Sequence, residues 1–369
     1  MRNKVISILF ILMLFAGAAA HLIMPDRVYS ESEKRNLQQV PSASVASVLS
    51  GKFGSELETY LADQFPGRDN WVAAKTICER LSGKRESGGV YYADDGYLIE
   101  IYRSFNGKQT SANVAAVRAL QDAMDEAGIP MRTMLVPTTS HILSEKLPPY
   151  APTADQQSVA DYAARRGLRL VPVTDALAEH RDEYIYYKTD HHWTSLGAYY
   201  AYAAWMCAKD LTPAPLTDWT KETLSTEFRG TTYNKVNDPW AAHDTIDAYY
   251  RNPAHSVDYN RGYYVTDTIY ERRYLEGRDQ YGVFLNSNQE TTVITGPGTG
   301  KLLILKDSFA NTFAQFVVDD YAETHLIDLR FFRGSVRKYI EKNGITEVLV
   351  LYNIANFTSD TDLSRCGNP

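Results

Sequence analysis

Short apolar runs alternate with helix-like segments along much of this 369-residue chain. Apolar runs of strand length occupy residues 134–136, 168–173, 302–305, 325–329 and 347–351. Helical spacing marks residues 114–124, 159–166, 309–318 and 336–342. This alternation predicts βαβ units, and therefore an α/β fold with a mostly parallel sheet flanked by helices. In such sheets, functional side chains collect where the strands end.

The first 24 residues predict an export signal. Arg2 and Lys4 precede an apolar run over residues 5–24, which at roughly 20 residues is long enough to span a bilayer. The basic flank should stay in the cytoplasm, so the rest of the chain is expected to be extracytoplasmic. Ala18-Ala19-Ala20 also fits a cleavage site. The segment is thus a removed signal peptide or a retained membrane anchor, with a buried core helix as the alternative.

The remaining chain divides into an arm and one large domain. Residues 25–85 read as a polar tether and a helical arm, because apolar residues recur at helical spacing between 43 and 83. Residues 90–99 predict a hairpin that turns at Asp95-Gly96. Residues 86–369 then form the main domain, interrupted by a tyrosine-rich insertion at about 215–290. Its tyrosines are expected either to stack on sugar rings beside the site or simply to pack an irregular segment.

Charge and cysteine content exclude several classes of protein. The net charge is −7 and there is no long basic run, so nucleic acid is not an expected partner. Cys78, Cys207 and Cys366 form no metal-binding pattern, and Cys207 is expected to be buried. A disulfide between Cys78 and Cys366 stays open at this point.

A serine follows one predicted strand directly. The apolar run 302–305 breaks into Lys306-Asp307-Ser308-Phe309, where a helix is expected to start. A serine at such a turn lies near unpaired backbone N–H groups, which can stabilise an oxyanion. The alternative is structural, because Asp307 or Ser308 could be no more than a helix cap.

The second polar element is Asp190-His191-His192-Trp193. His192 could take the proton of Ser308 while Asp190 orients its ring, and Trp193 could form a pocket wall. The alternative is a pair of structural histidines before a helix capped by Thr194 or Ser195.

A metal site must also be considered, since aspartate and histidine are both ligand types. Metal-dependent phosphoesterases need further aspartates in glycine-flanked motifs, and these are not found near a strand end. No metal and no cofactor are therefore expected.

Several blocks together resemble the DHHW protein family, which is related to the SGNH-like acetyltransferases of the alginate O-acetylation type. The blocks are Ser32-Glu33 with residues 35–37, residues 63–69, 89–92, 95–98, Asp190-His191-His192-Trp193, 281–285, 306–311, 351–353 and 356–357. The resemblance implies a flavodoxin-like, SGNH-hydrolase-like domain and a triad of Ser308, His192 and Asp190. The Asp-His pair precedes the serine, which implies a circularly permuted motif order. Lys306 stands where the common Gly-Asp-Ser pattern has glycine.

Further candidates for contacting the substrate or the oxyanion are Asn288, Trp193, His191, Tyr281 and Asn311. The resemblance implies an extracytoplasmic O-acetyltransferase that acts on a cell-envelope or secreted polysaccharide through an acyl-serine. It also implies an acyl donor delivered by a multi-pass membrane O-acyltransferase. Two alternatives stay open, a carbohydrate O-acetylesterase of the same mechanism and a non-catalytic glycan-binding envelope protein.

Overall fold

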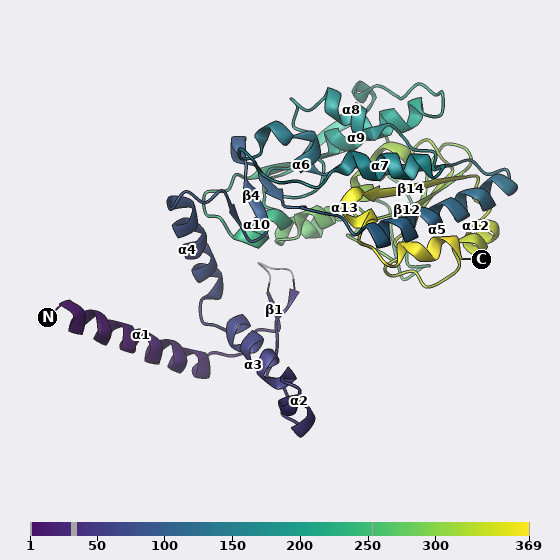
Figure 1. Cartoon of the computed structure of the whole chain (residues 1–369). Helices are drawn as coiled ribbons and strands as arrows, with labels where there is room; N and C mark the ends of the chain where they lie inside the picture. The colour runs from purple at the N-terminus through teal and green to yellow at the C-terminus, as the bar shows by residue number, and fades with distance from the viewer. Residues whose placement is uncertain (1, 31–34, 253, 369) are drawn as a thin grey trace. The chain divides into compact units, whose positions relative to one another are not determined.

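The computed structural model describes residues 2–30, 35–252 and 254–368, which form two compact units (Figure 1). The first contains residues 2–88 and 233–240, and the second contains residues 89–232 and 241–368, apart from the gaps just stated. Ser32 and Glu33, expected as part of an N-terminal signature, lie outside the described residues.

The first unit is mainly helical. Its elements are α1 (Arg2–Ile23), β1 (Tyr29–Ser30), β2 (Arg35–Asn36), α2 (Val45–Leu49), α3 (Lys52–Asp63), α4 (Arg68–Leu81) and β3 (Glu86–Ser87). Residues 233–240 join it through α4, because Thr76 Oγ1 donates to the Val236 carbonyl at 2.5 Å and Arg80 pairs with Asp238 at 2.5 Å. The predicted helical arm is thus helical along most of its length.

Helix α1 is long and apolar enough to cross a bilayer over Lys4–His21, where its mean hydropathy is 2.0. Its side chains from Lys4 to Phe15 are exposed, unlike those of a buried core helix. Length and composition alone do not separate an anchor from a signal sequence, which passes the same test.

A seven-stranded sheet organises the second unit. Its strands are, in spatial order, β10 (Tyr264–Thr266), β9 (Val257–Tyr259), β11 (Thr291–Thr295), β13 (Glu323–Ile327), β12 (Lys301–Lys306), β14 (Glu347–Asn353) and β6 (Met131–Val136). Strands β13, β12, β14 and β6 are parallel, whereas β11, β9 and β10 continue the sheet in antiparallel fashion. The predicted strand–helix alternation produces the parallel part. The tyrosine-rich segment supplies β9 and β10.

Two apolar layers cover the two faces of this sheet. Alternate residues of β12 point to opposite faces, so Leu302 and Ile304 join one cluster while Leu303 and Leu305 join the other. The first cluster is covered by α8 (Val173–Glu179), α9 (Ser195–Cys207) and α11 (Phe309–Val317). The second is covered by α5 (Gly107–Glu126), α7 (Gln156–Arg165), α12 (Val336–Asn343) and α13 (Ile354–Phe357) (Figure 1).

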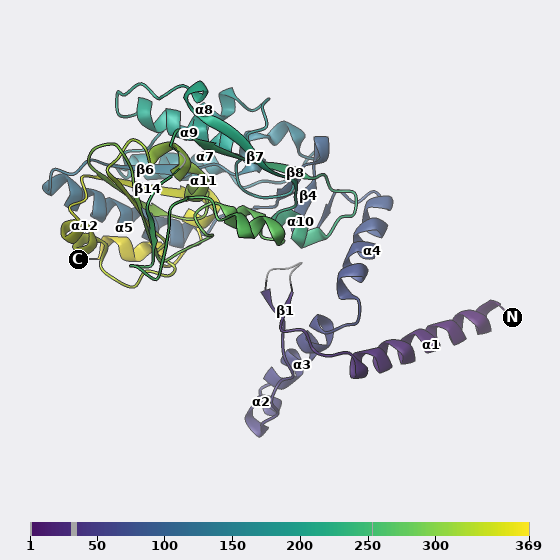
Figure 2. The same ribbon diagram turned by 180° about the vertical axis from the view of Figure 1, so that it is seen from behind.

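Smaller elements complete the unit. The predicted hairpin is β4 (Val90–Tyr92) with β5 (Leu98–Glu100), and a second hairpin, β7 (Thr220–Phe228) with β8 (Asp244–Tyr250), lies over α9 and α11 (Figure 2). The remaining helices are α6 (Thr139–Ile142) and α10 (Thr231–Val236), the latter shared by both units. Single 3-10 turns occupy Asp94–Gly96, Ser144–Lys146, Leu216–Asp218, Arg272–Glu276, Gln280–Val283 and Leu363–Gly367.

Two expectations about local structure are wrong. Residues 168–173 form no strand: Thr133 bonds to the Arg169 carbonyl and to the Val171 N–H, after which Pro172 leads into α8. Proline has no N–H to extend the ladder, so the pairing stops there. Cys207 is exposed rather than buried, because it lies in the last turn of α9. All three cysteines are free thiols, which removes the Cys78–Cys366 bridge.

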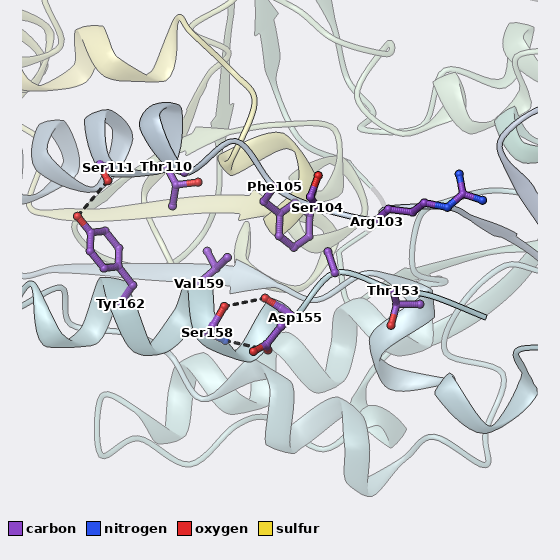
Figure 3. A pocket seen from close by; sticks show the side chains of 12 residues that line it. Arg103, Ser104, Phe105, Thr110, Ser111, Thr153, Asp155, Ser158, Val159 and Tyr162 are labelled. Carbon is purple, nitrogen blue, oxygen red and sulfur yellow. Dashed lines mark hydrogen bonds between the residues drawn. The ribbon is translucent and has the colours of Figure 1, made fainter. Parts of the chain in front are cut away.

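An open groove lies between the starts of α5 and α7 (Figure 3). Its volume is about 450 Å³. Phe105, just before α5, and Val159, on α7, line its middle, Tyr162 stands at one end, and Arg103 and Thr153 lie toward the other.

Candidate active site

Ser308 lies at the turn between β12 and α11, at the carboxyl edge of the parallel strands. The capping of this turn falls to Asp307, whose Oδ1 accepts the Phe309 N–H at 3.0 Å and whose Oδ2 accepts the Asn353 N–H at 2.8 Å. The Ser308 side chain makes no cap hydrogen bond to α11. Its hydroxyl is therefore available for another partner.

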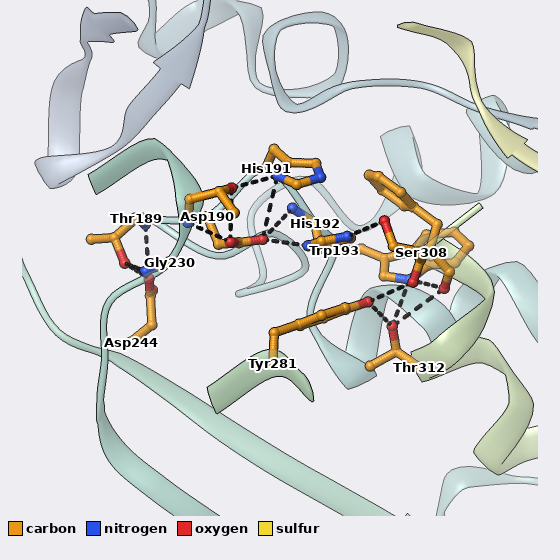
Figure 4. Close-up of polar contacts among 12 residues, drawn as sticks. Thr189, Asp190, His191, His192, Trp193, Gly230, Asp244, Tyr281, Ser308 and Thr312 are labelled. Carbon is orange, nitrogen blue, oxygen red and sulfur yellow. Dashed lines mark hydrogen bonds and ion pairs between the residues drawn. The ribbon is translucent and has the colours of Figure 1, made fainter. Parts of the chain in front are cut away.

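That partner is His192 (Figure 4). Its Nε2 lies 2.7 Å from Ser308 Oγ, although the two residues are 116 positions apart. Its Nδ1 lies 2.5 Å from Asp190 Oδ1, which also accepts the His192 backbone N–H at 2.9 Å. Because Nδ1–H donates to the carboxylate, Nε2 accepts from the Ser308 hydroxyl. The structure thus brings together the three residues predicted to act as a unit.

Asp190 is held on its other side by the start of α10. Its Oδ2 accepts the Thr231 N–H at 2.7 Å and the Thr231 hydroxyl at 3.0 Å. The preceding Gly230 leaves room for the carboxylate, since a Cβ there would come within 2.2 Å of Asp190. The carboxylate is therefore fixed by a neighbouring segment as well as by the histidine it orients.

A second buried aspartate anchors the loop that carries this motif. Asp244, at the start of β8, accepts the Lys188 N–H at 2.8 Å, and both the N–H and the hydroxyl of Thr189, at 2.8 and 2.5 Å. The loop closes where the Thr194 N–H donates to the Ile185 carbonyl at 2.9 Å. Thr194 also caps α9, as the sequence predicted, while His192 contacts Asp190 and Ser308.

Burial and charge set the protonation of the pair. Burial lowers the pKa of His192 and His191 adds to this, against the opposing effect of Asp190. Burial alone would raise the pKa of Asp190, but His192, His191 and its hydrogen bonds hold it well below its usual value. The resting pair is therefore a neutral imidazole against a carboxylate, the form that a general base requires.

Tyr281 and Trp193 support these groups from behind. The Tyr281 ring stacks on His192, and its hydroxyl donates to the Ser308 carbonyl at 3.1 Å and bonds to Thr312 Oγ1 at 2.8 Å. Trp193 is completely buried, so it is not the pocket wall that the sequence suggested. Its indole N–H reaches the Phe309 carbonyl at 3.1 Å and Thr312 Oγ1 at 3.0 Å (Figure 4).

Asn288 and Asn311 both contact a buried lysine. Lys306 Nζ donates to Asn311 Oδ1 at 2.7 Å and to Asn288 Oδ1 at 3.1 Å. Asn311 is buried, and its Nδ2 donates to the Ser287 carbonyl at 3.2 Å. Burial lowers the pKa of Lys306 to about 8. Asn311 therefore stabilises the loop and the lysine, and Asn288 contacts the same lysine through its amide oxygen.

His191 lies beside a small cavity of about 10 Å³, which is room for about one water. Tyr102, Thr138, Ser140 and Asn353 also line it. His191 Nδ1 bonds to Thr231 Oγ1 at 2.5 Å, and its ring centroid lies 3.8 Å from that of His192. His191 thus borders a small cavity with polar groups in its lining.

Asp190, His191 and His192 could also form a metal site by residue type, since their ligand atoms all lie within 4.8 Å of one another. Both ring nitrogens of His192 already contact other side chains, Asp190 and Ser308. A metal bound through His192 would have to break one of these two contacts.

Sequence reasoning missed Gly230, Thr231, Asp244 and Tyr102. None of them lies in a block with recognisable spacing, and Thr231 and Asp244 are 41 and 55 residues from their partners Asp190 and Thr189. The sequence signal for Gly230 and Thr231 was the Gly230-Thr231-Thr232 run, which comes shortly after β7.

Comparison with known proteins decides the family. A family profile described as DHHW protein matches residues 82–327. The chain belongs to the DHHW protein family. A relative from Pseudomonas aeruginosa, named "Probable alginate O-acetylase AlgJ", is 26% identical over 178 residues, which is 44% of each chain. The DHHW chain thus spans less than half the length of the curated relatives it matches.

Solved structures of similar fold include a DHHW family protein from Eubacterium siraeum, with a TM-score of 0.64 and 24% identity over 77% of this chain and 96% of that one. The O-acetyltransferase domain of Pseudomonas putida AlgJ has a TM-score of 0.50 and 14% identity over 75% of this chain and 94% of that one. At sequence identities this low, the structural similarity establishes the fold alone. The DHHW chain has an SGNH-like α/β fold, in which the Asp-His motif precedes the serine.

Proposed function

We propose that this protein is an extracytoplasmic O-acetyltransferase that moves an acetyl group onto a hydroxyl of a cell-envelope or secreted polysaccharide. The observation that carries the proposal is the 2.7 Å contact between Ser308 Oγ and His192 Nε2. Distant relatives named for alginate O-acetylation support the chemistry and the polysaccharide acceptor.

In the first half-reaction Ser308 Oγ attacks the acetyl carbonyl of the donor, and His192 Nε2 takes the serine proton. Asp190 stabilises the imidazolium that forms. The tetrahedral intermediate collapses, the donor's leaving group takes the proton from His192, and acetyl-Ser308 remains. The Ser308 backbone N–H would be this turn's donor to the oxyanion, because the Phe309 N–H already bonds to Asp307 Oδ1.

In the second half-reaction a sugar hydroxyl attacks acetyl-Ser308, and His192 takes its proton. Collapse releases the acetylated sugar and returns that proton to Ser308 Oγ. Water in place of the sugar would give an esterase by the same steps. The two activities therefore differ only in which hydroxyl reaches the acyl-serine.

In this proposal the N-terminal part exports the catalytic domain and holds it outside the cytoplasm. Residues 1–24 export the chain, as a retained anchor or a cleaved signal, and residues 25–85 form the tether and arm that carry the domain from residue 86 onward. A multi-pass membrane O-acyltransferase would deliver the acyl donor. The exposed apolar helix α1 supports placement at a membrane.

The test is acyl-enzyme formation with p-nitrophenyl acetate. The wild type should release p-nitrophenolate in a burst and gain the mass of one acetyl group on the peptide that contains Ser308. Ser308→Ala should lose both, whereas Ser364→Ala, whose hydroxyl donates only to the Thr361 carbonyl, should keep both. Full activity in Ser308→Ala would refute the proposal. Adding an oligosaccharide then separates transfer from hydrolysis, since a transferase yields acetylated sugar at the expense of acetate.

A further inference from the structure

The open groove between α5 and α7 does not include the triad, but neighbouring residues of one segment line the groove and the small cavity beside His191. The extended segment after β5 lines both: Tyr102 borders the small cavity, and Arg103 and Phe105 border the groove. On the opposite wall, the Ala154 N–H donates to the Tyr102 carbonyl at 2.6 Å. Residues that line the groove are thus directly adjacent, by the chain or by a hydrogen bond, to Tyr102 of the small cavity.

Gln156 makes the same connection through its side chain. It is the buried first residue of α7; its Oε1 accepts the Thr138 N–H at 2.9 Å and its Nε2 donates to Thr138 Oγ1 at 2.5 Å. Thr138 lines the small cavity, while Asp155 and Ser158 on either side of Gln156 line the groove. The cavity also touches Asn353, whose N–H is held by Asp307 next to Ser308. Contacts through Gln156, Thr138 and Asn353 thus link the groove to the edge of the sheet that presents the serine.

The lining of the groove has the character of a carbohydrate site. Phe105 and Tyr162 offer aromatic surface, and hydroxyl side chains such as Thr110 and Ser111 surround them. A hydroxyl that donates one hydrogen bond keeps lone pairs for further donors. At about 450 Å³ the groove also falls within the usual size of ligand sites.

The aromatic end of the groove is held in place before any ligand arrives. The Tyr162 hydroxyl donates to Ser111 Oγ at 3.1 Å and so links α7 to α5 (Figure 3). The Arg166 guanidinium lies 5.2 Å from the centroid of the Tyr162 ring. Phe105 packs near Tyr102, with ring centroids 6.3 Å apart. Fixed aromatic rings reduce the entropy that binding must overcome.

We propose that the groove lined by Arg103, Phe105, Ser158 and Tyr162 binds several sugar units of a polysaccharide chain and leads the next unit toward Ser308. The inference rests on the proposed function for the identity of that chain as the acetyl acceptor. Sugar rings would lie against Phe105 and Tyr162, and their hydroxyls would bond to the serine and threonine side chains. None of the tyrosines of residues 215–290, which could also stack on sugar rings, lines this groove.

The test blocks the groove without removing any packed side chain. Ser158→Trp places a large ring in the groove, and Gln157→Trp adds the same ring at an exposed position on α7 that does not line it. Binding of hexasaccharides of mannuronate, β-1,4-glucose and N-acetylglucosamine is measured by titration calorimetry on the full chain. Hydrolysis of p-nitrophenyl acetate by every variant reports on the triad.

At least one hexasaccharide should bind to the wild type, to Gln157→Trp and to Ser308→Ala with similar affinity. Ser158→Trp should bind it roughly tenfold more weakly or worse. Gln157→Trp should cleave p-nitrophenyl acetate at the wild-type rate, which shows that a tryptophan on this helix leaves the triad intact. Equal binding by Ser158→Trp and the wild type, or no binding of any of the three at millimolar concentration, would overturn the inference. If the wild type binds a hexasaccharide but does not cleave p-nitrophenyl acetate, the proposed function fails and the groove inference stands.

Discussion

The ring of Tyr281 lies flat against the imidazole of His192, with ring centroids 3.8 Å apart and planes inclined by 8°. Tyr281 comes from the 3-10 turn Gln280–Val283, at the end of the tyrosine-rich segment, so an element that is irregular in sequence positions the proposed base. The same residue fixes the serine turn through its hydroxyl, which donates to the Ser308 carbonyl. The Tyr281 ring therefore positions His192, and its hydroxyl stabilises the turn that carries Ser308.

Two substitutions of Tyr281 should separate the effect of its ring from that of its hydroxyl. Tyr281→Phe keeps the stacked ring and loses one hydroxyl, so acyl-enzyme formation should fall only a few-fold, which corresponds to about 1 kcal/mol. Tyr281→Ala removes the ring and leaves space beside His192, so the rate should fall by about 10² or more. Burst kinetics with p-nitrophenyl acetate measure both. Equal losses in the two variants would mean that the stacking does not position His192.

Gly230 should tolerate no side chain. In Gly230→Ala the new Cβ would meet Asp190 at 2.2 Å, so the carboxylate must move away from His192. We expect a destabilisation of about 1–3 kcal/mol and at least a tenfold loss of acylation rate. Gly277→Ala is the matched control, since a Cβ there comes no closer than 3.8 Å to other atoms. Thermal unfolding and burst kinetics on both variants test this, and a fully active Gly230→Ala protein would contradict it.

The pH profile should follow His192. Burial lowers its pKa below 6.5, and the base must be neutral to act. Therefore kcat/KM for p-nitrophenyl acetate should rise with pH through a midpoint below 6.5 and be flat near neutrality. Because Asp190 raises the pKa of His192, Asp190→Asn should move the midpoint lower still and reduce the plateau by about 10²–10⁴. A midpoint above 7 in the wild type would be inconsistent with the observed burial.

Lys306 should make stability depend on pH in the alkaline range. Its pKa is about 8 in the folded chain and 10.5 when unperturbed. The unfolded chain therefore binds more protons between these values, and stability should rise with pH there, by up to about 3 kcal/mol in total. Lys306→Met should lack this rise, and it leaves Asn311 Oδ1 without its donor at a cost of about 1–3 kcal/mol. Urea unfolding of both proteins at several pH values measures the difference, and parallel curves would exclude the effect.

Metal removal should leave the acyl chemistry unchanged. Asp190, His191 and His192 could bind a cation by residue type, but His192 uses both ring nitrogens in contacts with Asp190 and Ser308. Dialysis against a chelator should not alter burst amplitude, and added Zn²⁺ should inhibit, since it competes for those nitrogens. Loss of activity on chelation that Zn²⁺ restores would favour a metal enzyme.

Local pattern was enough to predict much of the fold. The strands β6, β12, β13 and β14 were visible because buried parallel strands are short apolar runs. Helices α7 and α12 were visible from their helical spacing and from the glycines that follow them, Gly167 and Gly344. The pattern failed at residues 168–173, where Pro172 allows two ladder hydrogen bonds and then stops the strand. It also could not show that β9 and β10 extend the main sheet, because pairing depends on partners distant in sequence.

For the site, the sequence by itself determined the chemical types and their order: an aspartate two residues before a histidine, and a serine at a strand-to-helix turn. Only the tertiary structure decided that Ser308 bonds to His192 rather than capping α11, because Asp307 takes the capping role. The tertiary structure also brings Thr231, Gly230, Asp244 and Tyr281 into contact with the loop that carries Asp190 and His192. Those contacts join segments tens of residues apart, and only folding brings such segments within hydrogen-bond distance.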